Sequence, residues 1–235
     1  MASLADIPTS RTWNLDETGM FPQTRNRKKK VLAATNMFAN VQESNDRTNV
    51  LALVCVNADG GYVPPFFILP GKKTRVRDTA GGMKGSTFAA SESAFLATKL
   101  FIQYFEWFVQ STPPDRPVLV IVDGYKCHFS SRTLQYGRKH DIDLYALPAH
   151  TSHFLRPLNV SVYHHFKRLL DDEKRVFRVK ERRMVERCDM VAVALNALAG
   201  RLTRAYIVAG FEQTGLYPLS RDKMIDGIIG DEPSR

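Results

Sequence analysis

The chain has 235 residues, and its 44% hydrophobic content is typical of a globular protein and not of a disordered one. The 33 Lys and Arg residues outnumber the 24 Asp and Glu residues, and the net charge of +9 favours a polyanionic partner. The sequence contains no long apolar run and no signal-peptide pattern, so we expect no membrane partner. Its three scattered cysteines lack Cys-x-x-Cys spacing, which argues against a disulfide scaffold or a thiolate zinc site.

The N-terminal part predicts a loop, a strand and a hairpin. Residues 1–12 have the composition of a loop, and residues 13–19 predict a short strand that runs into a turn. Residues 50–56 form an apolar run typical of a strand buried on both faces, and residues 62–69 return as its partner. A Gly-rich, basic connection follows over residues 74–86.

The middle of the chain alternates helices and strands. Residues 91–110 carry apolar and aromatic side chains at spacings of three and four, which predicts a helix whose aromatic stripe packs in the core. Residues 118–122 are the strongest predicted strand. A helix over 131–140 and a strand over 142–147 follow.

The C-terminal part predicts helices. One long helix is expected over 158–188 and a second over 190–207, before a turn at 211–218 and a polar tail. The whole order predicts an α/β fold, namely an RNase H-like mixed sheet flanked by helices, in which the first three strands are antiparallel.

Two acidic residues lie where a metal site is expected. Asp16 lies in the first predicted strand, and Asp123 follows the strongest one directly. Ligand sites in open α/β sheets gather at strand ends, and carboxylates are the ligands that Mg²⁺ and Mn²⁺ prefer. A pair of such ions about 3.5–4 Å apart can cleave a phosphodiester. The two residues are therefore candidate metal ligands.

Five sequence blocks occur in order and span nearly the whole chain. They are Trp-Asn-Leu-Asp-Glu-Thr-Gly at 13–19, Val-Asn-Ala-Asp-Gly-Gly-Tyr-Val-Pro-Pro-Phe-Phe-Ile-Leu-Pro-Gly-Lys at 56–72, Arg-Pro-Val-Leu-Val-Ile-Val-Asp-Gly at 116–124, Leu-Pro-Ala-His-Thr-Ser-His-Phe-Leu-Arg-Pro-Leu-Asn-Val-Ser-Val-Tyr at 147–163 and Ala-Gly-Phe-Glu-Gln-Thr-Gly-Leu-Tyr-Pro-Leu at 209–219. Together these blocks resemble those of the DDE superfamily endonucleases, in particular the pogo/Tigger/CENP-B-like transposases related to Tc1/mariner.

The resemblance implies a cut-and-paste transposase catalytic domain in which three acids hold two Mg²⁺ (or Mn²⁺) ions. Asp16 and Asp123 match the first two acids, but Asn159 stands at the third position. An amide oxygen can ligate Mg²⁺ without supplying charge, so we expect affinity or activity to fall at least about 10–100-fold. The side chains three and four positions on, Val162 and Tyr163, are not acidic and cannot replace the lost carboxylate.

The resemblance also implies DNA as the partner and the nucleus as the location. The basic cluster at 25–30 is either a solvated loop, a phosphate contact or a nuclear import signal, and the dense charges at 167–187 are either a solvated helix face or a DNA-backbone track. The His150, His153 and Cys127-His128 spacing is poor for zinc. The candidate DNA contacts are Arg27, Lys28, Lys29, Lys30, Lys72, Lys73, His150, His153 and Arg156.

Two main functions remain open. The first is a transposon-derived DDE domain that binds DNA and divalent metal, with strand cleavage and transfer weakened by Asn159. The second is a domesticated, non-enzymatic DNA-binding or scaffold protein, and an RNase H-like nuclease with another substrate is a more distant option. We expect an N-terminal loop at 1–12, the catalytic domain at 13–190 and a helical extension and tail at 191–235. A homodimer is possible, and the upstream helix-turn-helix module usual in the family is not visible in this sequence.

Overall fold

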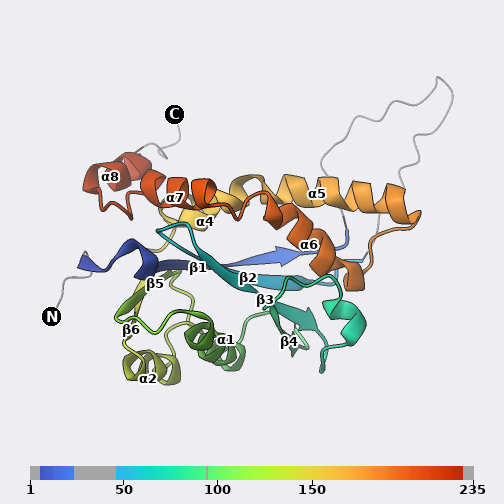
Figure 1. Cartoon of the computed structure of the whole chain (residues 1–235), viewed down its shortest axis with the longest axis horizontal. Helices are drawn as coiled ribbons and strands as arrows, with labels where there is room; N and C mark the ends of the chain where they lie inside the picture. The colour runs from blue at the N-terminus through green and yellow to red at the C-terminus, as the bar shows by residue number, and fades with distance from the viewer. Residues whose placement is uncertain (1–5, 24–45, 94, 230–235) are drawn as a thin grey trace.

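A six-stranded mixed sheet forms the centre of the computed structural model, which describes residues 6–23, 46–93 and 95–229 (Figure 1). The strand order is β4-β3-β2-β1-β5-β6. The pairs β1–β2 and β2–β3 are antiparallel, whereas β3–β4, β1–β5 and β5–β6 are parallel. The strands are β1 (Thr12–Met20), β2 (Val50–Asn57), β3 (Tyr62–Pro70), β4 (Thr87–Ser91), β5 (Val118–Val122) and β6 (Ile142–Ala146). This arrangement confirms the predicted RNase H-like sheet.

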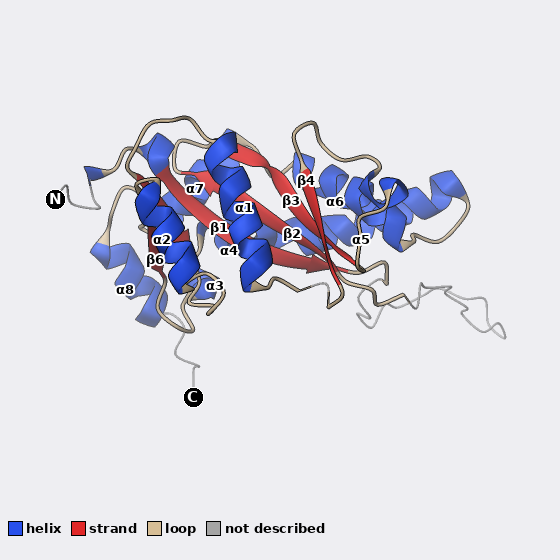
Figure 2. Ribbon diagram, turned by 90° about the horizontal axis from the view of Figure 1, so that it is seen from below, coloured by secondary structure: helices blue, strands red, loops and turns tan. Residues whose placement is uncertain are grey.

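Helices cover both faces of the sheet (Figures 1 and 2). On one face lie α1 (Thr98–Ser111) and α2 (Ser131–Lys139); on the other lie α5 (Val162–Glu181), α6 (Met190–Ala199) and α7 (Arg204–Gln213). The remaining helices are α3 (Ser152–Leu155), α4 (Pro157–Val160), α8 (Arg221–Ile229) and the 3-10 turns η2 (Thr9–Arg11), η3 (Val76–Thr79) and η4 (Arg187–Asp189).

The sheet separates two hydrophobic cores, and β2 contributes to both. Val54 and its even-numbered neighbours pack with α5, α6 and α7, whereas Leu53 and its odd-numbered neighbours pack with the aromatic side chains of α1. Strand side chains alternate between faces, so the unbroken apolar run at 50–56 supplies both cores, as predicted. The same alternation places Asp16 and Glu17 of β1 on opposite faces.

The prediction for residues 91–110 was partly wrong. The helix α1 begins only at Thr98, and the preceding Thr87–Ser91 form the edge strand β4, which was not predicted. This strand lacks the alternation that marks a half-buried strand, and its parallel pairing with β3 is a non-local contact. The aromatic stripe of α1 is core packing as predicted, except that Phe95 lies before the helix with 64% of its surface exposed.

The prediction of one long helix over 158–188 was also wrong. The backbone breaks at Ser161, whose hydroxyl donates to Pro157 O, and α5 ends at Glu181 because Arg182 is left-handed with φ 53°. Beyond it, the expected helix over 190–207 is two helices, and the predicted tail contains α8.

Helices α6 and α7, which follow residue 190, pack into the hydrophobic core on one face of the sheet. The side chains of α6 and α7 share one hydrophobic cluster with β2 and α5. Among the described residues no single helix is long and apolar enough to cross a membrane; Arg187–Ala199 and Arg204–Gln213 pass that test only together, as a pair bent by 74°. The domain boundary at 190 stays a prediction.

Candidate metal centre

The parallel pairing of β1 with β5 places the two predicted acids side by side. The pairing runs from Thr12 and Leu119 to Asn14 and Ile121, after which β5 ends and β1 continues. Asp123 follows the end of β5 directly, so it lies next to Asp16 where the two strands part.

Asn14 fixes this junction from within the core. Its side chain is fully buried, donates from Nδ2 to Ile121 O at 3.0 Å and accepts at Oδ1 from Leu158 N at 3.1 Å. One amide thereby ties β1 to the end of β5 and to α4, the short helix that carries Asn159.

The guanidinium of Arg156 bridges the two acids. Its Nη1 donates to Asp16 Oδ1, its Nη2 lies 3.3 Å from Asp123 Oδ2, and Nη2 also donates to Ser152 Oγ at 2.9 Å. Arg156 is buried, and its Nε has no hydrogen-bond partner among the described residues. A positive charge therefore occupies the space between Asp16 and Asp123.

Asp16 is the more enclosed of the two carboxylates, with a side chain 5% exposed against 31% for Asp123. Burial raises the pKa of Asp16 to about 7, although the charge and hydrogen bond of Arg156 act to lower it. On the same side of the sheet, the Tyr163 hydroxyl donates to Asp16 O at 3.2 Å. Solvent therefore reaches the pair from the side of Asp123.

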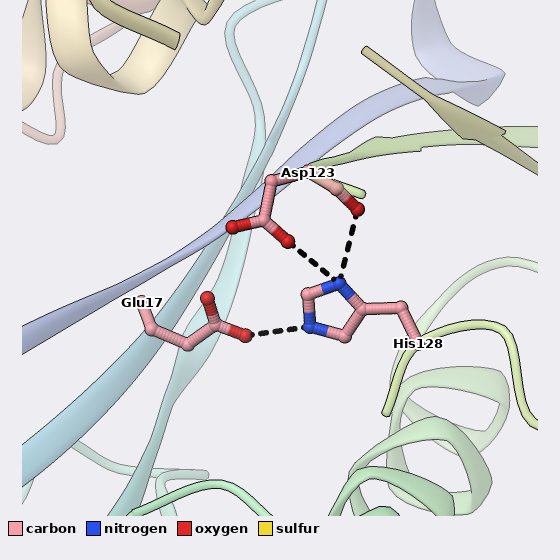
Figure 3. A group of neighbouring side chains, drawn as sticks. All are labelled: Glu17, Asp123 and His128. Carbon is pink, nitrogen blue, oxygen red and sulfur yellow. Dashed lines mark hydrogen bonds and ion pairs between the residues drawn. The ribbon is translucent and has the colours of Figure 1, made fainter. Parts of the chain in front are cut away.

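On the other side of Asp123, His128 lies between two carboxylates (Figure 3). Its Nδ1 is 2.9 Å from Asp123 Oδ1, and its Nε2 is 2.9 Å from Glu17 Oε1. Burial alone would lower the pKa of His128, but its bonds to Asp123, Cys127 and Glu17 outweigh burial and raise it to about 12. His128 is therefore an imidazolium that donates from both ring nitrogens.

The ligand atoms of Glu17, Asp123 and His128 lie within 4.8 Å of one another, a spacing compatible with a metal ion. In the arrangement seen here both ring nitrogens of His128 are engaged by Asp123 and Glu17, and this contact holds Asp123 in place. Burial would raise the pKa of Asp123, but the hydrogen bonds from His128 and from Tyr125 N outweigh it and lower the pKa to about 2.

A tight turn brings His128 back to Asp123. His128 N donates to Tyr125 O, and Asp123 Oδ1 accepts from Tyr125 N at 3.1 Å. The imidazole ring then packs against Phe101 of α1, with 4.5 Å between ring centroids. The aromatic face of α1 therefore helps to position the residues beside Asp123. Tyr125 itself is exposed.

Asn159 is linked to the two acids through Ser152 and Arg156. Its Nδ2 donates to Ser152 O at 3.0 Å, and Ser152 Oγ in turn accepts from Arg156. Because the chain breaks at Ser161, the helical spacing assumed in the prediction does not hold here. Further along α5, Asp171 binds Lys174 at 3.3 Å and supplies no replacement carboxylate.

The oxygen donors fit a divalent cation. Asp16 and Asp123 point at one position, and the protein itself places a cation there in the form of Arg156. Carboxylate and amide oxygens are the ligands of Mg²⁺ and Mn²⁺. The residues that would hold the ion are Asp16 and Asp123, and a ligand role for Asn159 stays a prediction.

The predicted DNA contacts fall into different places. Lys72 and Lys73 are exposed at the end of β3, where they line a groove of about 720 Å³ together with Lys99 of α1. His150, with φ 64°, lies exposed on the loop before α3, and His153 lies exposed within α3. Arg156 was expected to contact DNA but is buried against Asp16 and Asp123, and Arg27, Lys28, Lys29 and Lys30 lie outside the described residues.

The charges at 167–187 do not form one continuous basic track. Lys174 is buried and binds Asp171 and the backbone of Gln23, while Arg183 and Arg187 bind Asp189 and the buried Asp78 at 2.7 and 2.9 Å. Several of the prominent cations are therefore paired with acidic residues of the chain itself.

The sequence interpretation missed Glu17, His128 and Tyr163 as parts of the site. Glu17 follows Asp16 directly, and Cys127-His128 comes soon after Asp123, so proximity in sequence was a signal for both. His128 was weighed only as a zinc ligand. No sequence signal showed that Tyr163 would reach the backbone of Asp16.

Comparisons with known proteins agree with this fold. The Mos1 strand transfer complex matches over 96% of this chain and 56% of that chain, with a TM-score of 0.60 and 11% identity. The mariner Mos1 paired end complex with Mg matches over 98% of this chain and 57% of that chain, with a TM-score of 0.54 and 11% identity. At these identities the likeness shows the fold alone, and this chain spans little more than half of each.

Two sequence comparisons complete the picture. A Cochliobolus lunatus protein named MFS-type transporter clz9 is 22% identical over 191 residues, which are 77% of this chain and 20% of that protein. The chain thus spans about a fifth of that relative. The sequence model described as DDE superfamily endonuclease matches residues 46–173, more than half of the chain. The chain belongs to the DDE superfamily endonuclease family.

Proposed function

We propose that this chain is the catalytic-type domain of a transposase, that it binds DNA and a divalent metal, and that its strand cleavage is weakened by Asn159. The observation that carries the proposal is the meeting of Asp16 and Asp123 at one cation position, at the point where β1 and β5 separate. One acid within β1 and one directly after β5 form a pair of carboxylates from which a metal-dependent phosphodiester chemistry can be built.

The residues have separate tasks in this proposal. A bound divalent ion supplies a more acidic water and stabilises the leaving oxygen of a phosphodiester. Asp16 and Asp123 hold the metal, and His128 fixes the rotamer of Asp123 from the opposite side. Asn159 offers an oxygen without charge, which lowers the affinity for two dications below that of a site with three carboxylates.

DNA is proposed as the partner on the grounds of charge. The net charge is +9, and Lys72, Lys73 and Lys99 line one groove beside β4. Lysines gathered in a groove suit the regularly spaced phosphates of a nucleic acid. The two matched structures are a strand transfer complex and a paired end complex with Mg, and a homodimer and a nuclear location remain parts of this proposal.

A second function is favoured by one observation, the placement of Arg156 between the acids. A domain whose carboxylates are neutralised by its own side chain can serve as a non-enzymatic DNA-binding or scaffold module. Such a module needs the fold and the basic groove but no ion.

Nicking of supercoiled DNA in Mn²⁺ or Mg²⁺ separates the two functions. We expect Asn159→Asp to nick faster than the parent by about 10-fold or more, and Asp123→Ala to be inactive. If none of the three proteins nicks DNA and all three still bind it, the result would favour the non-enzymatic module.

A further inference from the structure

Arg156 is placed as a bound cation would be. Its two terminal nitrogens face one oxygen from Asp16 and one from Asp123, so the guanidinium bridges the same two carboxylates that a shared ion would bridge. A guanidinium keeps its charge at every pH that a protein tolerates, so this positive charge is permanent.

Arg156 already supplies a positive charge between Asp16 and Asp123. A divalent ion placed beside the guanidinium would bring two cations together in a partly buried site, which is costly in a low-dielectric environment. An ion between Asp16 and Asp123 is therefore accommodated only by moving Arg156.

The attachment of Arg156 permits such a movement. Its backbone is extended, with φ −97° and ψ 112°, between the two short helices α3 and α4. Its Nε has no partner among the described residues, so the guanidinium is held through its terminal nitrogens by Asp16, Asp123 and Ser152. Asp123 is partly exposed, so the guanidinium can move toward solvent on the side of Asp123.

We propose that Arg156 is a tethered cation that occupies the position shared by Asp16 and Asp123, so that a divalent ion binds there only after the guanidinium has moved out. The inference rests on the proposed function, because it concerns the same two metal ligands. It adds that the domain is held in a metal-free state by its own side chain, in addition to the effect of Asn159.

The test measures the binding of Mn²⁺ to the full chain from the electron paramagnetic resonance signal of the Mn²⁺ that stays free. Arg156→Gln removes the tethered charge, and we expect it to bind Mn²⁺ about 10–100-fold more tightly than the parent. Arg187→Gln is the matched control, because it removes another arginine from a buried aspartate, Asp78, at a position outside the site. We expect the control to bind Mn²⁺ as the parent does.

Two results would overturn the inference in distinguishable ways. Equal Mn²⁺ affinity in the parent and Arg156→Gln would remove the role of Arg156 and leave the proposed metal site standing. No Mn²⁺ bound by either protein would remove the metal site as well, and with it the metal-dependent part of the proposed function.

A second measurement covers the case in which Arg156→Gln does not fold without an ion. The nuclear magnetic resonance signal of the Arg156 Nε–H in the parent is assigned by its loss in Arg156→Lys. This signal is followed while Mg²⁺ is added to saturation. Saturation is judged by competition with Mn²⁺. We expect this resonance to shift and to exchange faster with water as the guanidinium leaves. An unchanged resonance at saturation would overturn the inference.

Discussion

Arg156 Nη2 lies 3.3 Å from Asp123 Oδ2, which joins the loop after β6 to the end of β5. The same guanidinium reaches Asp16 in β1, so three distant sequence blocks meet at one side chain. The geometry of the site therefore depends on the contacts that hold β1, β5 and α4 together.

The first prediction concerns pH and His128. Its folded pKa is raised to about 12, above the ordinary value of 6.5, so the folded state keeps a proton that the unfolded state releases between these values. Stability from this group is complete below about pH 6.5 and is lost as pH rises toward 12. We expect the free energy of unfolding to fall by up to about 1.4 kcal/mol per pH unit between about pH 7.5 and 8.5.

His128→Gln isolates this contribution, because Gln keeps a hydrogen-bonding group and cannot be charged. The pH range starts above the pKa of Asp16, which is about 7, so that this carboxyl contributes little to the slope. Urea unfolding of both proteins across the range measures the difference. Identical slopes in the parent and the variant would show that His128 is not an imidazolium in the folded state.

The second prediction concerns Asn14, the buried amide that joins β5 to α4. Asn14→Leu has a similar volume but removes the partners of Ile121 O and Leu158 N. Each buried backbone group left without a partner costs about 1–3 kcal/mol, so we expect a clear loss of stability in urea unfolding. A loss below about 0.5 kcal/mol would contradict the role assigned to this residue.

The third prediction concerns the packing of α7 against α4. A Cβ added at Gly210 would lie 2.5 Å from Ser161 Oγ and 2.8 Å from Pro157 O, and backbone cannot easily yield. We expect Gly210→Ala to cost about 1–3 kcal/mol, measured by thermal unfolding. Gly200→Ala is the control, because nothing lies within 4 Å of its added Cβ and its φ is −76°, so it should be neutral or slightly stabilising. Equal effects of the two substitutions would contradict this packing.

The fourth prediction concerns the groove between β4 and α1. Lys73→Ala and Lys99→Ala each remove a cation from its rim, and we expect each to weaken DNA binding regardless of sequence and to reduce the salt slope by about 1. Lys223→Ala on α8 removes the same charge elsewhere and should leave the slope nearly unchanged. Fluorescence anisotropy over a range of salt concentrations measures all three; three equal slopes would mean that the groove is not the DNA surface.

Much of the sheet could be predicted because its strands carry local signals. The strands at 50–56 and 118–122 were recognised because each is an unbroken apolar run, which is typical of a strand buried on both faces. The edge strand β4 and the break at Ser161 depend on contacts with β3 and with α7, and such non-local contacts leave no periodic pattern in the sequence.

The acidic residues of the candidate site could be predicted from the sequence, whereas its positively charged residues could not. Asp16 was predicted within the first strand and Asp123 directly after the strongest one, and the parallel pairing of β1 and β5 explains why they meet. Arg156 was predicted to contact DNA, and its burial against the two carboxylates was not predicted. Only the path of the chain through α3 and α4 shows that its guanidinium reaches the carboxylates.

The most direct test of the metal centre is the anomalous signal of Mn²⁺ in crystals of the Asn159→Asp, Arg156→Gln double variant, which has the third carboxylate and lacks the tethered cation. We predict a Mn²⁺ peak at ligand distance from both Asp16 and Asp123. A peak bound instead between Glu17 and His128, or the absence of any peak in saturating Mn²⁺, would contradict the account.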